Sequence, residues 1–278
     1  MNTHTITGGG GLKLNVAETG VRGAPSLLFL HGISQNYDAW TGQLESELAD
    51  EFHLAAFDLR GHGASEKPLE PAAYSEPALW AADVQAVIEG LELHRPILVA
   101  WSYGGIVALD YLKTFGDNEV AGLVMVAALS QNAVKAGYAH LGSSTAHLKN
   151  MFSKDFGTNY AATLTFAQTM TASPPSEDEL RRQLAAMMMT PPQVRYNLGS
   201  RKVDHSETLS ALTLPVLCLH GDGDTVVKVS SSEHTLQHAP TASLTMYSGV
   251  GHLPFVEARE RFNEDLDRFA QVARIPRA

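Results

Sequence analysis

The sequence predicts an α/β protein with a mainly parallel sheet covered by helices on both faces. Two observations favour this class: short apolar runs alternate with helical segments along most of the chain, and one stretch of roughly eighty residues interrupts that alternation. Strands separated by helices form mainly parallel sheets that are buried on both sides. The chain has 278 residues, of which 44% are hydrophobic, which suffices for one large core with an inserted cap.

The predicted elements follow in chain order. Residues 12–16 alternate between apolar and polar side chains with the period of a strand, and Gly8 to Gly11 form the preceding turn. A turn is favoured over a phosphate-binding loop because these glycines are followed by neither a Lys-Ser/Thr pair nor a helical pattern. Further strands are expected at 26–30, 53–57, 96–101, 120–126, 214–219 and 243–247, and helices at 38–49, 76–91 and 103–115.

The regular alternation stops between Leu129 and Glu207. A plain loop of that length is uncommon in a compact domain, and the stretch contains helical patterns at 159–170 and 176–189. The second opens with Ser-Glu-Asp-Glu, an S-x-x-E capping box, which is favoured over an acidic site for a substrate amine. We therefore expect an α-helical cap at 130–207, inserted into a core formed by residues 1–129 and 208–278.

Methionine and aromatic residues gather in this insertion. Because the unbranched thioether chain adapts to different shapes, they are consistent with a permissive apolar pocket. The alternative is that they only bury the insertion against the core. The set comprises Met151, Met170, Met187, Met188, Met189, Phe152, Phe156, Tyr160 and Phe166.

A candidate nucleophile stands where the strand at 96–101 gives way to a helix. Ser102 lies between Ala100 and Gly104 at the spacing of the G-x-S-x-G nucleophile elbow, with alanine in place of the first glycine. A chain that turns so sharply needs small residues on either side of the corner. Ser102 is therefore the predicted nucleophile.

A candidate acid and a candidate base follow later in the chain. Asp224 comes after the apolar strand at 214–219, and His252 lies in a glycine-rich loop after the strand at 243–247. The chain order Ser102, Asp224, His252 is one of the known triad orders, and a serine nucleophile needs a base and a group that orients the base. Asp222 is the alternative acid, but we expect it to stabilise its turn.

Three other acidic or basic side chains are expected to have structural roles. Asp58 and Arg60 lie at the end of the strand at 53–57, where they are predicted to fix the Gly61-His62-Gly63 turn. Asp110 is predicted to be a helix-face residue.

With two further motifs, these patterns resemble the α/β-hydrolase fold superfamily over nearly the whole chain. His31-Gly32 follows the strand at 26–30, and Phe57-Asp-Leu-Arg-Gly-His-Gly-Ala-Ser65 follows the next strand. The resemblance implies a mostly parallel, eight-stranded twisted sheet and a capped serine hydrolase or esterase. It also implies an oxyanion hole made by the backbone N–H groups of Ile33 and Tyr103. Relatives that act on haloalkanes and epoxides differ, because they carry aspartate at the elbow.

The predicted reaction is hydrolysis of carboxylic esters or lactones of small to medium, mostly hydrophobic substrates through an acyl-enzyme. His252 would take the proton of Ser102 while Asp224 orients the imidazole. Two alternatives stay open: a C–C bond hydrolase or perhydrolase with the same triad, and a ligand receptor with a vestigial triad.

Composition and residue spacing limit the partners, location and cofactors that can be expected for this chain. A formal charge of −10 argues against a nucleic-acid-binding face. No apolar run approaches the roughly 18 residues of a membrane-spanning helix, and the N-terminus lacks a signal pattern, so a cytoplasmic location is expected. Cys218 is the only cysteine and is predicted to be buried and inert. The spacing of the 12 histidines indicates no metal site, and no cofactor is expected. The oligomeric state stays open.

Overall fold

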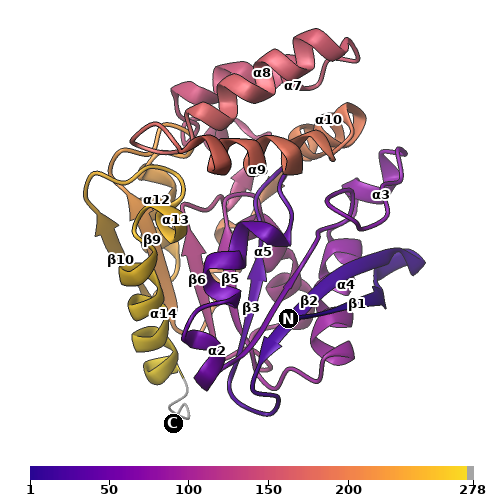
Figure 1. Ribbon diagram of the computed structural model, residues 1–278. Helices are drawn as coiled ribbons and strands as arrows, with labels where there is room; N and C mark the ends of the chain where they lie inside the picture. Colours follow the sequence, from indigo (N-terminus) through magenta and orange to yellow (C-terminus); the bar gives the residue numbers. More distant parts are fainter. Residues whose placement is uncertain (274–278) are drawn as a thin grey trace.

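An eight-stranded sheet forms the centre of the computed structural model, which describes residues 1–273 (Figure 1). The strands in chain order are β1 (Asn2–Thr7), β2 (Lys13–Gly20), β3 (Ser26–Leu30), β4 (His53–Phe57), β5 (Ile97–Trp101), β6 (Gly122–Val126), β9 (Val216–Gly221) and β10 (Ala242–Tyr247). Their order across the sheet is β1-β2-β4-β3-β5-β6-β9-β10. β2 is antiparallel to β1 and to β4, and the other neighbouring pairs are parallel. The predicted fold class is confirmed.

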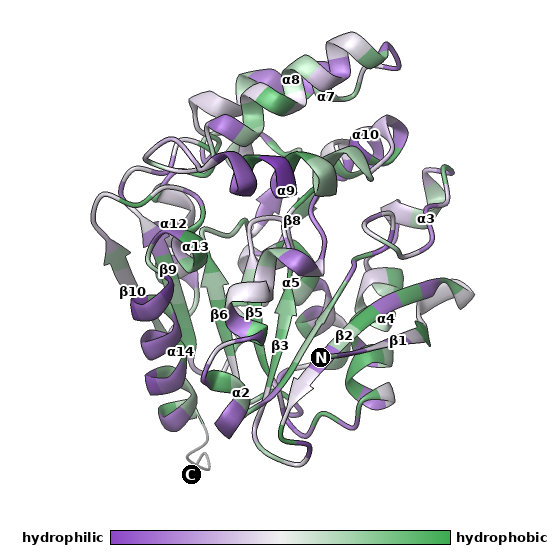
Figure 2. Ribbon diagram, in the orientation of Figure 1, coloured by the Kyte–Doolittle hydropathy of each residue, from purple (hydrophilic) through white to green (hydrophobic). Residues whose placement is uncertain are grey.

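The central strands carry uninterrupted apolar runs because both faces of the sheet are covered. Every residue of β3, β4, β5, β6 and β9 is buried, and Figure 2 shows hydrophobic residues along these strands. β1 differs, since it is an edge strand whose residues are exposed or half-buried. Its polar sequence offers no apolar run, which is why the sequence analysis did not predict it.

Helices cover both faces of the sheet. One group comprises α4 (Pro77–Gly90), α5 (Gly104–Phe115), α11 (Ser206–Ala211) and α12 (Ser230–His238), which contact one another in that order. The other group comprises α1 (Thr41–Leu44), α2 (Leu48–Glu51), α13 (Pro254–Glu257) and α14 (Arg259–Ala273). Figure 2 shows that α14 is largely hydrophilic on the side that faces away from the sheet.

The helix predicted at 38–49 is broken into three short pieces. A 3₁₀ turn (Tyr37–Trp40) leads into α1, and α2 begins only at Leu48. The Ser46 hydroxyl donates to the Gln43 carbonyl at 2.7 Å and accepts from the Leu48 amide at 3.3 Å. A serine that bonds to nearby backbone in this way competes with helix continuation.

The insertion leaves and re-enters the core at one place. β7 (Gln131–Asn132) pairs antiparallel with β8 (Val203–Asp204). Between them lie α6 (Lys135–Tyr138), α7 (Leu148–Met151), α8 (Phe156–Gln168), α9 (Glu177–Met188) and α10 (Pro192–Ser200). In Figure 1, α7 to α10 lie above the carboxyl ends of the parallel strands.

The two helices predicted in the insertion correspond to α8 and α9. The Ser176 hydroxyl accepts a hydrogen bond from the Glu179 amide at 3.2 Å, so the serine half of the predicted capping box is present, while the Glu179 carboxylate accepts from Arg182 and Gln183 instead. None of the helices within residues 1–273 combines the length and the apolar character needed to cross a lipid bilayer.

Candidate functional site

Ser102 occupies a strained corner between β5 and α5. Its φ of 54° lies in the left-handed region, which is uncommon for residues other than glycine and is often found at functional sites. A Cβ added at Gly104 would lie 2.5 Å from the Leu30 carbonyl oxygen, and one at Gly32 would lie 3.0 Å from the Ser102 Cβ. Close approach of the neighbouring backbones therefore requires the small residues that the sequence shows here.

Asp224 and His252 are brought together from the loops after β9 and β10. His252 Nδ1 lies 2.7 Å from Asp224 Oδ2, while Asp224 Oδ1 accepts from the amides of Val226 at 2.8 Å and Val227 at 3.0 Å. Burial alone would raise the pKa of the Asp224 carboxyl, but His252 and His220 outweigh burial and hold this pKa well below its usual range. An ionised Asp224 accepts a hydrogen bond from Nδ1–H of His252, which keeps the proton on Nδ1 and leaves Nε2 free to act as a base.

His220 is a second imidazole beside Asp224 that the sequence analysis did not assign to the site. Its Nε2 donates to the Val227 carbonyl at 2.9 Å and lies 3.3 Å from Asp224 Oδ2. Since a carbonyl only accepts, the proton is on Nε2, and Nδ1 accepts from Ser232 at 2.7 Å. The available sequence signal was its place at the end of β9, four residues before Asp224.

The loop that carries His252 is held by residues from three parts of the chain. Trp101 Nε1 donates to the His252 carbonyl at 3.0 Å, and the His252 amide donates to the Met170 carbonyl at 2.7 Å. Glu257 accepts from the Gly251 amide at 2.9 Å and from the Ala172 amide at 2.8 Å. The insertion therefore contacts the backbone of the candidate base directly, through the Met170 carbonyl, and is linked to the preceding residue through Glu257.

The backbone amides of Ile33 and Tyr103 are the candidate oxyanion donors. Tyr103 directly follows Ser102, and Ile33 follows Gly32, which packs against Ser102. In the described part of the chain, neither amide donates to a protein acceptor. Two donors next to the candidate nucleophile are thus available to a bound group.

Asp222, the alternative acid, is engaged in its own turn. Its Oδ1 accepts from the Gly249 amide at 2.7 Å and its Oδ2 from the Ser248 hydroxyl at 3.0 Å. Gly249 has a φ of 71°, so this carboxylate fastens a turn that favours glycine. The structure agrees with the structural role expected for Asp222.

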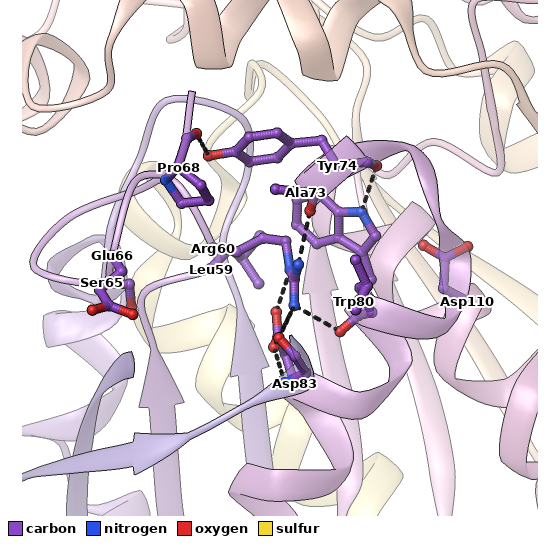
Figure 3. Close-up of polar contacts among 12 residues, drawn as sticks. Leu59, Arg60, Ser65, Glu66, Pro68, Ala73, Tyr74, Trp80, Asp83 and Asp110 are labelled. Carbon is purple, nitrogen blue, oxygen red and sulfur yellow. Dashed lines mark hydrogen bonds and ion pairs between the residues drawn. The ribbon is translucent and has the colours of Figure 1, made fainter. Parts of the chain in front are cut away.

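Arg60 and Asp58 have structural roles, as expected. The Arg60 side chain bonds to residues beyond the Gly61-His62-Gly63 turn. Arg60 Nε lies 2.7 Å from Asp83 Oδ2, and the same guanidinium donates to the carbonyls of Gly9, Ala73 and Leu79 (Figure 3). It therefore joins the loop after β4 to α4. Asp58 accepts from the Ala64 amide at 2.7 Å and fixes the turn itself.

Asp110 lies on a face of α5 and has a structural role, as expected. The sequence did not predict its partners: the side chain is fully buried, 2.7 Å from Arg201 and 3.1 Å from His205. Both partners lie near the end of the insertion, more than 90 residues away in sequence. Asp110 thus anchors the returning chain to α5, a role that depends on tertiary contacts.

Some methionine and aromatic side chains of the insertion are buried in the core, and others are exposed on the surface. Met151, Met170 and Met187 are buried in the core cluster, as the packing alternative required. Met189 is 46% exposed and Phe156 is 70% exposed. Composition alone therefore did not define a pocket.

Cys218 is buried, and burial raises the pKa of its thiol to about 12, so it is inert as predicted. Among residues 1–273, no group of three or more His, Cys, Asp or Glu side chains is arranged to hold a metal ion.

Comparison with known proteins agrees with this fold. Residues 27–265 match the model of the Alpha/beta hydrolase family. The pimeloyl-[acyl-carrier protein] methyl ester esterase of Nitrosomonas europaea is 29% identical over 259 residues, which cover 90% of this chain and 96% of that protein. The bifunctional esterase/perhydrolase DCH of Acinetobacter calcoaceticus is 27% identical over 274 residues, covering 95% of this chain and 98% of that protein. The crystal structure of the esterase RhEst1 from Rhodococcus sp. ECU1013 has a TM-score of 0.92 and 33% identity, covering 98% of this chain and 99% of that chain.

Proposed function

Because the chain belongs to the alpha/beta hydrolase family, we propose that it hydrolyses carboxylic esters or lactones of small to medium, mostly hydrophobic substrates. Ser102 is the nucleophile, His252 the general base and Asp224 the residue that orients the imidazole. The observation that carries the proposal is the 2.7 Å contact between His252 Nδ1 and Asp224 Oδ2, in a chain whose elbow serine has a left-handed φ. The similarity to several esterases supports it.

The reaction proceeds through an acyl-enzyme. His252 Nε2 removes the Ser102 proton as the hydroxyl oxygen attacks the ester carbonyl, and the amides of Ile33 and Tyr103 receive the oxyanion. Collapse of the tetrahedral intermediate expels the alcohol, which takes the proton from His252. Water then attacks the acyl-enzyme with the same assistance, and release of the acid restores Ser102.

Residues 130–207 serve as a cap in this proposal. The insertion lies over the carboxyl ends of the parallel strands (Figure 1), where ligands bind in open α/β sheets. Its contact with the candidate base supports this role, because the Met170 carbonyl accepts from the His252 amide. The cap would exclude bulk water and limit the size of the substrate.

Ser102→Ala tests the proposal. Alanine fits the elbow but has no nucleophile, so turnover of p-nitrophenyl acyl esters should fall by several orders of magnitude with an unchanged melting temperature. Residual activity above about a tenth of wild type would exclude Ser102 as the nucleophile. Fast multiple turnover by the wild type would also exclude a receptor with a vestigial triad.

A perhydrolase activity is the second candidate, favoured by the similarity to the esterase/perhydrolase of Acinetobacter calcoaceticus. Hydrogen peroxide would attack the acyl-enzyme in place of water, giving a peracid and free Ser102. Peracid formation from an ester and peroxide that is lost in Ser102→Ala would establish it.

A further inference from the structure

Within residues 1–273, four nitrogen atoms surround the carboxylate of Asp224, two at each oxygen. Oδ1 accepts from the amides of Val226 at 2.8 Å and Val227 at 3.0 Å. Oδ2 lies 2.7 Å from Nδ1 of His252 and 3.3 Å from Nε2 of His220. The two amides belong to the loop that carries Asp224, and His252 is the candidate base. His220 is therefore the contact that the proposed reaction does not yet use.

The imidazole of His220 is fully buried, and both of its ring nitrogens are engaged. Nε2 donates to the Val227 carbonyl at 2.9 Å, and Nδ1 accepts from the hydroxyl of Ser232, which lies on α12, at 2.7 Å. A ring whose two nitrogens are bonded to the protein in the core has no nitrogen left for a substrate. His220 is thus excluded as a second general base.

Packing alone does not account for an imidazole at this position. The residues that precede His220 in β9 are Val, Leu, Cys and Leu, and all of them are buried. A polar ring in such a strand costs free energy unless its nitrogens are bonded, whereas an apolar side chain costs none. The value of the imidazole therefore lies in the groups that its nitrogens contact.

His220 acts on Asp224 by two routes. Directly, its Nε2–H lies beside Oδ2, where a donor favours the ionised carboxylate. Indirectly, it binds the carbonyl of Val227, the residue whose amide donates to Oδ1. Both oxygens of the carboxylate are therefore held by contacts that depend on one buried ring.

We propose that His220 is a positioning residue for ester hydrolysis, because it holds the Asp224 carboxylate where it accepts from Nδ1–H of His252. His220 acts through Asp224 and does not touch the substrate. When the carboxylate is not held, the His252 proton can move to Nε2, the nitrogen that must be unprotonated to take the proton of Ser102. The inference rests on the proposed function and deepens it.

The tautomer of His252 tests this role without any measurement of turnover. In ¹⁵N NMR at about pH 8, where histidine rings are ordinarily neutral, protonated and unprotonated ring nitrogens give separate signals. His252 is assigned by the loss of its signals in His252→Gln. The wild type should carry the proton on Nδ1, whereas His220→Leu should place part of it on Nε2. A proton that stays entirely on Nδ1 in folded His220→Leu would overturn the proposal.

Kinetics with p-nitrophenyl butyrate gives a second readout. In His220→Leu, kcat should fall about tenfold, equivalent to ~1.4 kcal/mol, with little change in KM, because the base is affected and the substrate contacts are not. His220→Gln should restore most of kcat and the wild-type tautomer, since its NH₂ group can donate to the Val227 carbonyl. Equal losses of kcat in the two variants would overturn the role of the donor.

His53→Leu is the matched control. His53 is also buried, and its Nε2 lies 2.9 Å from a carboxylate, that of Glu18. Glu18 keeps Arg22 as a partner at 2.6 Å, so this variant removes a similar contact far from the loop that carries Asp224. Its kcat and its His252 tautomer should equal those of the wild type. The same changes in His53→Leu as in His220→Leu would mean general destabilisation and would overturn the proposal.

Circular dichroism shows whether the His220 variants fold. If they do not, the wild-type ¹⁵N spectrum decides, because His220 must carry its proton on Nε2 to donate toward Asp224, and a proton on Nδ1 would overturn the proposal. Failure of the proposed function is a separate outcome. It would appear as turnover that survives in Ser102→Ala, while the tautomers would still report whether His220 holds Asp224.

Discussion

The indole Nε1 of Trp101 donates a 3.0 Å hydrogen bond to the carbonyl oxygen of His252, so the residue before the candidate nucleophile holds the residue that would activate it. The two rings lie 5.4 Å apart. The elbow after β5 and the loop after β10 are thereby joined directly, although 151 residues separate them in sequence.

Trp101→Phe should lower kcat by roughly tenfold. Phenylalanine keeps most of the packing against Phe255 but loses the hydrogen bond, which is worth ~1 kcal/mol. Trp40→Phe is the matched control, since Trp40 packs against Trp101 and Phe255 and its buried Nε1 has no partner in the described chain. Equal loss of kcat in the two variants would mean that packing, not the hydrogen bond, positions His252.

Glu257→Gln should also lower kcat, by about tenfold, with little change in KM. The carboxylate accepts from the amides of Ala172, Gly251 and, at 3.4 Å, Leu253. A glutamine NH₂ group cannot accept, so either the Ala172 amide of the insertion or the Gly251 and Leu253 amides beside His252 would lose their acceptor, and the loop would shift. Glu89→Gln, which changes an exposed carboxylate on α4, should leave the kinetics unchanged. Wild-type kcat in Glu257→Gln would show that the loop holds His252 without this carboxylate.

The candidate triad could be predicted because each member lies in a short local pattern. Ser102 and Asp224 follow apolar strands, and His252 lies in a glycine-rich loop after the alternating strand β10. Each of these strand ends can be recognised from the sequence. Trp101 and Glu257 carry no comparable pattern, since their importance comes from backbone groups far away in the chain.

The elements of the fold also differ in whether a local sequence pattern predicts them. β3 and β4 were predicted to the residue because they are continuous apolar runs in a sheet buried on both sides. β7 and β8 have two residues each and form only by pairing with one another. No local sequence pattern therefore predicts them. The buried pairing of Asp110 with Arg201 was missed for the same reason.

Asp224→Asn and Asp222→Asn should separate the two neighbouring carboxylates. If Asp224 orients His252, its amide variant favours the wrong imidazole tautomer, a change that costs about 10⁴ in kcat in serine proteases. Asp222→Asn should instead cost about 1 kcal/mol of stability, because its carboxylate accepts from Gly249 and Ser248. Kinetics on one activated ester and melting temperatures measure both effects. An inactive Asp222→Asn variant together with an active Asp224→Asn variant would show that the acid was misassigned. If both variants are active, the triad is refuted.

Two buried histidines should make the protein lose stability as the pH falls below about 6.5, their usual pKa. His31 and His62 are fully buried. Burial lowers the pKa of His31 to about 4, and burial together with His31 lowers the pKa of His62 well below its ordinary value. His31 Nε2 accepts from the Leu59 amide at 3.0 Å while Nδ1 donates to the Gly32 carbonyl at 2.7 Å, so the folded state uses the neutral ring.

The sign and size of this effect follow from proton linkage. Between pH 6.5 and about 4 the unfolded chain binds protons at His31 and His62 that the folded chain does not bind, so the free energy of unfolding decreases as the pH falls. Each histidine can contribute a slope of up to ~1.4 kcal/mol per pH unit. Urea unfolding at pH 7, 6 and 5 should show this loss, and His62→Gln should reduce the slope by about half. His94→Gln, which replaces an exposed histidine, is the matched control. A free energy of unfolding that stays constant from pH 7 to 5 in the wild type would rule out neutral, buried rings at both positions.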